Sequence, residues 1–209
     1  MDEGTAPPPD GDRLLDVVVE MLETEGYESV QLRAVAKRAR SSLATIYRRY
    51  PTRDELILAA LEYWMARHRY AGIAGPPADE GSSLREGLMS LFRTIFEPWE
   101  RHPEMLKTYF RVRSSPNGQK LFRFGFDIVA PAGMELLKGV DGDLVADLEA
   151  ILENVIYGLL GRFSAGEIAV TDILPVLDRT VFRLIGGSPE KQSEPKPAEA
   201  PAALFDSGH

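Results

Sequence analysis

The chain has 209 residues, of which 44% are apolar and 27% charged, and its formal net charge is −8. This length can bury one sizeable core, or a small domain joined to a larger one, and the apolar fraction is typical of a folded protein. The lack of cysteine excludes disulfide bonds, thiolate zinc sites and cysteine nucleophiles, and the acidic balance argues against broad, non-specific binding to nucleic acid.

The two ends of the chain differ in composition from its middle. Residues 1–11 and 188–209 are rich in Pro and polar residues, and we expect both to be disordered tails. The N-terminus lacks the basic and then apolar layout of a signal peptide, and the longest apolar runs are far below the roughly 18 residues that span a bilayer. These features predict a soluble, cytoplasmic protein without a membrane partner.

The pattern between the tails is helical almost throughout. The first half contains clear start and stop signals: Gly26 ends one helix, Pro51 ends another, and Thr52 with Glu55 forms a capping box that opens a longer one. Apolar residues recur at helical spacing between these signals. The predicted helices of this half span residues 12–24, 32–39, 42–50 and 52–70.

The Gly- and Pro-rich stretch 71–81 predicts a domain boundary, with one domain over 12–70 and another over 71–187. Prolines at 98, 131 and 175 fall inside or near helix starts and predict kinks or breaks. Ser83 with Glu86 caps the first helix of the second domain, and Pro103 opens the next. The five predicted helices span residues 83–101, 103–112, 116–137, 143–165 and 171–185.

One window carries a charge opposite to the rest of the chain. Residues 31–53 hold seven basic side chains and no acid, whereas the remainder holds 17 basic and 32 acidic ones, a balance of −15. A merely solvated helix face usually mixes both signs, so this asymmetry favours a focused contact with DNA. The seven are Arg33, Lys37, Arg38, Arg40, Arg48, Arg49 and Arg53.

Helices 32–39 and 42–50 have the size and order of a helix-turn-helix, whose second helix enters the major groove. Arg48 and Arg49 suit phosphate or a guanine edge, and Arg33 is another candidate for a base edge. Arg53, with the first-turn amides of the fourth helix, forms a candidate phosphate site, while Lys37 and Arg38 add long-range attraction. Hydroxyl groups for phosphate are offered by Ser42, Thr45 and Tyr47, whereas Ile46 and Tyr50 are expected to pack inward.

The stretch 32–61, LRAVAKRARSSLATIYRRYPTRDELILAAL, resembles the signature of the TetR family of transcriptional repressors, and Gly26 and Tyr27 upstream also fit. The resemblance covers about residues 12–61. It implies that Thr45, Tyr47 and Arg53 contact phosphate. It also implies that bases or the groove wall are faced by Arg33, Leu43, Ala44, Arg48 and Arg49.

The chain departs from the family pattern at two places. Arg40 and Ser41 stand where Gly-Val is usual, so either Arg40 takes a left-handed backbone at a cost of about 1 kcal/mol, or the turn differs and Arg40 becomes a further phosphate ligand. Ala44 replaces a common Gly. Leu43 and Ala44 cannot donate hydrogen bonds, which leaves thymine-methyl contact as their best specific role.

The last two helices are candidates for a homodimer contact, because they carry more apolar surface than one core needs, and Gly158 and Gly161 permit close backbone approach. An ordinary buried core is the alternative. By resemblance these helices form a four-helix bundle between subunits. The residues that we expect in this contact are Leu148, Leu152, Val155, Leu159 and Val181.

The middle helices are rich in aromatic residues and Met, which suit an adaptable apolar pocket and equally a plain core. The resemblance implies an effector pocket here, and Arg111, Arg113 and Arg123 are candidates to pair with an acidic ligand group. The basic window is similar to that of repressors of sterol and lipid catabolism, which implies an acyl-CoA or sterol-like effector. The candidate pocket residues are Phe92, Phe96, Trp99, Met105, Tyr109, Phe110, Phe126 and Tyr157.

No arrangement of residues supports catalysis, a metal site or a cofactor, since the three histidines are scattered and no phosphate-binding glycine motif follows a strand. We therefore expect an all-α, homodimeric, ligand-responsive repressor of about nine helices that binds a palindromic double-stranded DNA operator and a small-molecule effector. A helical protein that only binds an apolar ligand, or a transcriptional activator of the same family, is the alternative.

Overall fold

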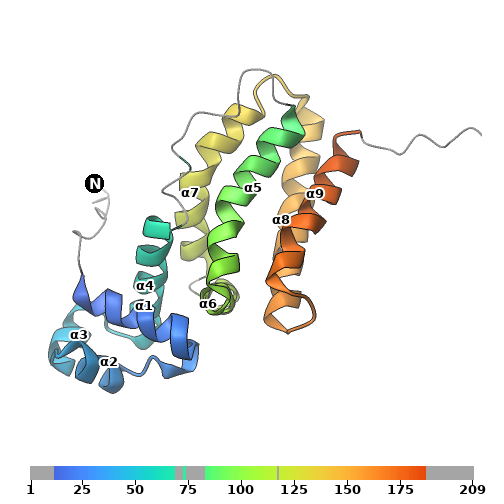
Figure 1. The fold of residues 1–209 in the computed structure, drawn as a ribbon. Coiled ribbons are helices and arrows are strands. Elements are labelled where there is room, and N and C mark those ends of the chain that lie inside the picture. Colours follow the sequence, from blue (N-terminus) through green and yellow to red (C-terminus); the bar gives the residue numbers. More distant parts are fainter. Residues whose placement is uncertain (1–11, 69–72, 74–82, 117, 187–209) are drawn as a thin grey trace, which may run out of the picture.

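The computed structural model describes residues 12–68, 73, 83–116 and 118–186, which form nine α-helices and two short 3₁₀ helices without a strand (Figure 1). This confirms the prediction of an all-α fold. Within these ranges, no helix has both the length and the apolar character that crossing a bilayer requires. No group of three or more His, Asp or Glu side chains in the same ranges is placed to hold a metal ion.

The N-terminal helices α1 (Arg13–Glu25), α2 (Leu32–Ala39), α3 (Leu43–Arg49) and α4 (Arg53–His68) form a compact head. α1 packs against both α2 and α4, and α2 packs against α3. The predicted bounds of α2 are confirmed, and the predicted capping contacts of α4 are present, with Thr52 and Glu55 joined at 3.1 and 3.2 Å. The head's core includes Leu15, Val18, Leu22, Val35, Ile46, Leu56 and Leu61, none of them more than 2% exposed.

The connection between α1 and α2 contains a 3₁₀ helix, Tyr27–Ser29, that the sequence did not predict. Gly26 ends α1 with a φ of 78°, a value that favours glycine, and the chain reverses there. The Ser29 hydroxyl then donates to the Gly26 carbonyl at 2.7 Å, which ties the connection to the end of α1. This segment therefore holds a defined position beside the head.

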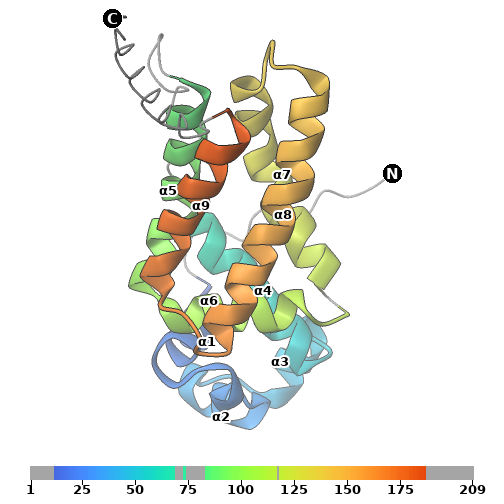
Figure 2. The ribbon, with the colours of Figure 1, turned by 90° about the vertical axis from the view of Figure 1, so that its right-hand side faces the viewer.

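The C-terminal half consists of α5 (Leu84–Arg101), α6 (Pro103–Arg113), α7 (Gly118–Leu136), α8 (Gly142–Ser164) and α9 (Ile173–Leu184), with a 3₁₀ helix, Val170–Asp172, before α9. Four of these helices stand side by side, and α6 lies between their foot and the head (Figure 2). α5 packs against α7 and α9, while α8 packs against α6 and α9. The predicted capping box of Ser83 and Glu86 is present.

The prolines interrupt these helices less than the sequence predicts. Pro98 and Pro131 both lie inside continuous helices, because each removes only one backbone hydrogen bond while the neighbouring turns remain packed. Pro175 is the third residue of α9, a position where a backbone N–H has no partner within the helix in any case. The predicted breaks at these positions are therefore wrong.

The head and the C-terminal half are in direct contact, since α1 and α4 both pack against α6, and α4 also packs against α7. Aromatic rings fill part of this junction, where Trp64 of α4 and Trp99 of α5 lie with their ring centres 4.5 Å apart. The Glu23 carboxylate of α1 accepts a hydrogen bond from the Trp64 indole at 2.8 Å and lies 2.9 Å from His102. The predicted boundary stretch 71–81 lies outside the described residues except for residue 73.

Candidate nucleic-acid interface

The turn between α2 and α3 is closed by Arg40, whose backbone is left-handed with φ 52° and ψ 43°. It is the one non-glycine residue with a positive φ in the described part of the chain. The backbone N–H groups of Arg40 and Ser41 both bond the Ala36 carbonyl, which satisfies the end of α2. Arg in this conformation costs about 1 kcal/mol relative to Gly, so the turn keeps a strained residue that places an exposed cation beside α3.

α3 presents a polar outer face and is fixed to the head by one buried side chain, Ile46. The Ser42 hydroxyl caps the helix by accepting the Thr45 N–H at 3.0 Å, and the two hydroxyl oxygens lie 2.9 Å apart. Tyr47 is 51% exposed, whereas Leu43 is half-buried against the core. The structure thus gathers on the exposed surface of α2 and α3 most of the predicted contact residues, namely Arg33, Ser42, Ala44, Thr45, Tyr47, Arg48 and Arg49.

Some cations of the basic window already have acidic partners. Arg38 donates two hydrogen bonds to Glu25, at 2.5 and 3.1 Å, and Arg49 pairs with Asp12, the cap of α1. The hydrogen bond that Arg49 donates to Asp12 raises the pKa of Arg49 above its usual range. Four cations form no ion pair or hydrogen bond through their side chains within the described ranges, and they supply the unbalanced positive charge of this surface: Arg33, Lys37, Arg40 and Arg48.

Arg53, predicted as a phosphate contact, points toward the connection between α1 and α2. Its guanidinium donates to the carbonyls of Val30 and Tyr27, both at 2.5 Å, and lies 3.7 Å from the Glu28 carboxylate. The side chain is 23% exposed. In this arrangement Arg53 holds the segment that leads into α2, so a phosphate contact stays a prediction that requires these donors to be shared or released.

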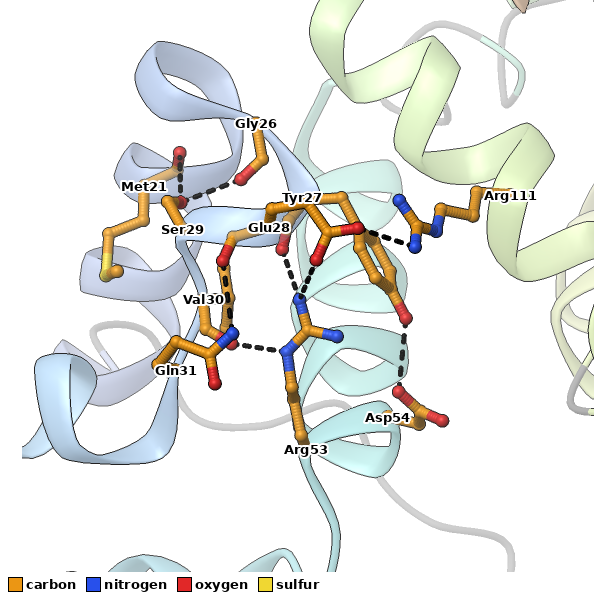
Figure 3. Close-up of polar contacts among 10 residues, drawn as sticks. All are labelled: Met21, Gly26, Tyr27, Glu28, Ser29, Val30, Gln31, Arg53, Asp54 and Arg111. Carbon is orange, nitrogen blue, oxygen red and sulfur yellow. Dashed lines mark hydrogen bonds and ion pairs between the residues drawn. The ribbon is translucent and has the colours of Figure 1, made fainter.

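Tyr27 lies between two guanidinium groups from different halves of the molecule (Figure 3). The Arg53 guanidinium carbon is 4.4 Å from the ring centre, and that of Arg111, from α6, is 4.0 Å from it. Arg111 also pairs with Glu28 at 2.6 Å, so one carboxylate faces both cations. The Tyr27 hydroxyl donates to Asp54 at 3.1 Å, and burial together with this bond raises the pKa of Tyr27. We call Tyr27, Glu28, Arg53, Asp54 and Arg111 the junction cluster.

The predicted effector-pocket residues differ in how far they are exposed. Phe110 is half-buried, and its ring contacts that of Tyr157 at 5.3 Å between centres. Phe126 is 48% exposed and Tyr157 43%, so these two rings lie at the surface rather than in the core, because they occupy outward-facing positions of α7 and α8. The other five are buried among the helices: Phe92, Phe96, Trp99, Met105 and Tyr109.

The predicted dimer residues lie mostly inside one subunit. Four of them are at most 8% exposed in the single chain, which leaves these side chains almost no surface to offer a partner: Leu148, Leu152, Leu159 and Val181. The reason is that the apolar stripe of α8 packs on α6 and α9 of its own chain. Val155 is only half-buried, and Ile151 nearby is 39% exposed. Gly161 packs within the chain against the Phe110 ring, whereas a Cβ at Gly158 would meet nothing within 4 Å.

Sequence reasoning gave no role to Tyr27, Glu28 or Asp12. Each makes such a contact with a residue 25 or more positions away, as in the Tyr27–Arg53 and Arg49–Asp12 pairs, and no spacing rule reveals these contacts. The only available signal was that Gly26 and Tyr27 match the family pattern.

Comparisons with known proteins agree with this architecture. The family model described as "Bacterial regulatory proteins, tetR family" matches residues 14–60, and "Tetracyclin repressor-like, C-terminal domain" matches residues 81–184. An uncharacterised HTH-type transcriptional regulator of Mycobacterium bovis is 34% identical over 94 residues, which are 45% of this chain and 43% of that protein. The HTH-type transcriptional repressor KstR of Rhodococcus jostii is 31% identical over 100 residues, 48% of this chain and 45% of that protein. The matched part is thus less than half the length of either relative.

Solved structures share the fold over most of the chain. A TetR transcriptional regulator from a Rhodococcus species has a TM-score of 0.60 at 22% identity, covering 85% of this chain and 95% of that one. FadR of Bacillus subtilis, solved in complex with stearoyl-CoA, has a TM-score of 0.58 at 15% identity, covering 85% of this chain and 98% of that one. Since family models match both the head and the C-terminal half, the chain belongs to the TetR family of transcriptional regulators.

Proposed function

We propose that the protein is a ligand-responsive transcriptional repressor that works in the cytoplasm, binds a palindromic DNA operator as a homodimer, and is released by a small apolar or amphipathic effector. The observation that carries this proposal is the outer face of α2 and α3, where exposed hydroxyls and cations without acidic partners lie together on an otherwise acidic protein. A helix of this kind enters the major groove, while its flanking groups bind phosphate.

The test is to select duplexes from a random pool with the whole chain and to titrate the winners at several salt concentrations. A specific complex must weaken steeply as salt rises, because bound cations release counterions from the phosphates. A protein that only binds an apolar ligand would retain no duplex even at low salt, and that result would end the proposal.

Replacing Arg48 by Ala is expected to relax the preference at one base pair by about 1–3 kcal/mol, because Arg48 is exposed on α3 without a partner in the described ranges. Tyr47→Phe, which removes a hydroxyl aimed at phosphate, should instead weaken binding to all sequences alike. Affinities for the selected duplex and its single-base variants distinguish the two. If Arg48→Ala keeps the full preference at every position, Arg48 does not read a base.

Operator binding by one head makes few contacts, and two half-sites are needed for a tight complex. We place the subunit contact on the outward side of α8, where Ile151, Val155 and Gly158 remain accessible in the single chain. This proposal keeps the prediction from sequence that α8 takes part in the contact, but it assigns the contact to other residues, on a neighbouring face of the helix. A bare glycine one turn beyond Val155 lets a second backbone approach closely.

Release by an effector requires that the C-terminal half move the head, and the junction cluster supplies a direct link. Arg111 belongs to α6, whereas Tyr27 and Glu28 belong to the segment that positions α2. A shift of α6 would take Arg111 from the ring and leave Glu28 to face Arg53 alone. The placement of α2 and α3 would then change in both subunits.

Arg111→Ala is expected to weaken operator binding about fivefold, since a cation on an aromatic face contributes about 0.5–1 kcal/mol at exposed sites and the ion pair adds a little more. The slope of affinity against salt should stay as in the wild type, because Arg111 touches no phosphate in this proposal. Lys107→Ala is the matched control, since Lys107 lies on the same helix and pairs only with Glu104 of its own turn at 2.6 Å. Equal effects of the two substitutions would contradict the link.

A further inference from the structure

Arg113, the last residue of α6, is a mostly buried cation that lacks hydrogen-bond acceptors. Its side chain is 20% exposed, and its guanidinium carbon lies 4.6 Å from the ring centre of Phe122 on α7 and 5.7 Å from that of Tyr157 on α8. The nearest carboxylate oxygen, on Glu153, is 4.0 Å away. Within the described ranges this side chain donates no hydrogen bond.

Arg85, in the same half of the protein, is an example of a guanidinium whose N–H groups have acceptors. Arg85 donates three hydrogen bonds to Asp178, at 2.9 to 3.1 Å, although its side chain is 42% exposed and therefore less in need of them. A guanidinium carries five N–H donors, and withdrawing it from water without acceptors is unfavourable. Arg113 is thus placed to bind an anion more closely than Glu153 does, whose carboxylate lies 4.0 Å away.

The surroundings of Arg113 define what kind of anion fits. The Ser114 and Tyr157 hydroxyls lie 3.4 Å apart beside it and can hydrogen-bond the same ligand group. Beyond them the surface is aromatic, because the Phe122 ring stacks on Phe126 with 5.7 Å between centres. Phe126 and Tyr157 are both more than 40% exposed, so part of each side chain is accessible to a ligand.

We propose that Arg113 binds the carboxylate of an amphipathic organic acid whose apolar body lies against the rings of Phe122, Phe126 and Tyr157. A carboxylate matches the planar fork of a guanidinium and forms charge-assisted hydrogen bonds with it, and these are stronger than neutral ones. The site rests on the proposed function in one respect, since it gives the effector a chemical class.

The position of Arg113 also connects the site to the head. Arg111 and Arg113 lie two residues apart, and successive positions along a helix turn by about 100°, so their side chains leave opposite sides of α6. Arg111 contacts Tyr27 and Glu28, whereas Arg113 faces α7 and α8. An acid that draws Arg113 toward α7 and α8 would therefore act on the turn of helix that carries Arg111.

The test uses decanoate and decanol as probes of equal chain length, titrated calorimetrically into the whole chain. The wild type should bind decanoate about tenfold more tightly than decanol, the preference that one charge-assisted contact provides. Arg113→Gln should remove this preference, and Glu153→Gln should increase it, because it removes the carboxylate that pairs with Arg113 in the described part of the chain. Arg93→Gln, the same change at an exposed position on α5, should leave it unaltered.

A structural role for Arg113 predicts a different pattern. Arg113→Gln should change the unfolding temperature little, because within the described ranges its one ion pair, with Glu153, spans 4.0 Å and includes no hydrogen bond. If that variant fails to fold, the preference for decanoate over decanol is measured instead in Arg113→Lys and Glu153→Gln. The first keeps the positive charge but not the planar guanidinium. Equal binding of acid and alcohol to the wild type, binding of neither, or an unchanged preference in Arg113→Gln would overturn the inference.

The two proposals fail separately. A protein that binds a selected duplex but shows no preference for decanoate refutes the acid site alone. A protein that prefers decanoate but retains no duplex refutes the repressor function and leaves the site standing.

Discussion

Replacing Gly158 by Trp is expected to convert the protein to folded monomers and to reduce operator affinity by at least about 100-fold. In the single chain Gly158 is exposed, and a Cβ at this position meets nothing within 4 Å. A second subunit packed on α8 would meet it directly. Without the partner, the second half-site no longer binds at the high effective concentration that linkage provides.

The measurements are sedimentation equilibrium for the oligomeric state and titration of the selected duplex for affinity. Gly142→Trp is the matched control, since it adds the same side chain to the first residue of the same helix, also into open space. Unfolding curves should show Gly142→Trp about as stable as the wild type, whereas Gly158→Trp should lose only the concentration-dependent stability that association provides. A Gly158→Trp protein that stays dimeric and binds DNA normally would show that the subunit contact lies elsewhere.

Ile46→Ala is expected to lower the free energy of unfolding by about 3 kcal/mol and to abolish most operator binding. Ile46 is fully buried and is the single buried residue of α3, so its loss leaves a cavity beneath the helix that faces DNA. Leu43, the first residue of α3, is only half-buried against the core and does not fill this cavity. The outward residues would then lose their common orientation even where the head remains folded.

Urea unfolding and duplex titration, both performed well below the unfolding midpoint, measure the two effects. Ile46→Val provides the graded control, because it removes one methylene and should cost only about 1 kcal/mol. If operator affinity falls in the same order as the free energy of unfolding in the two variants, the result agrees with the role of Ile46 as the anchor of α3. Normal DNA binding by a folded Ile46→Ala protein would mean that α3 is held by its ends alone.

Local sequence signals predicted most of the helices. The Ser83–Glu86 and Thr52–Glu55 capping boxes marked two helix starts. Such boxes can be read from the sequence because the two capping residues lie only three positions apart. Periodicity also identified the buried face of α8. It was unable to tell a face buried within one subunit from a face buried between two, because both require the same apolar spacing, and for this reason Leu148 and Leu152 were placed in the subunit contact.

The sequence predicted the site residues whose role depends only on exposure. It did not predict which basic side chains are already bound by residues distant in the sequence. Tyr47 and Arg48 lie on the exposed side of α3, as helical spacing from Ile46 requires. Arg49 and Arg53 look equally available in the sequence, yet Asp12 and the carbonyls of Tyr27 and Val30 already bind them. Such pairings depend on how α1 and α4 pack, which is a property of the fold as a whole.

The close contact of the Trp64 and Trp99 rings at the junction provides a built-in optical reporter. These are the only two indoles in the chain, one in the head and one in the C-terminal half, at a separation where their excited states interact. Any rearrangement that slides α4 past α5 must change this pair, while motions elsewhere leave it alone. Near-ultraviolet dichroism and emission of the unlabelled protein would therefore follow the relative movement of the two halves in real time, for every candidate effector and every duplex.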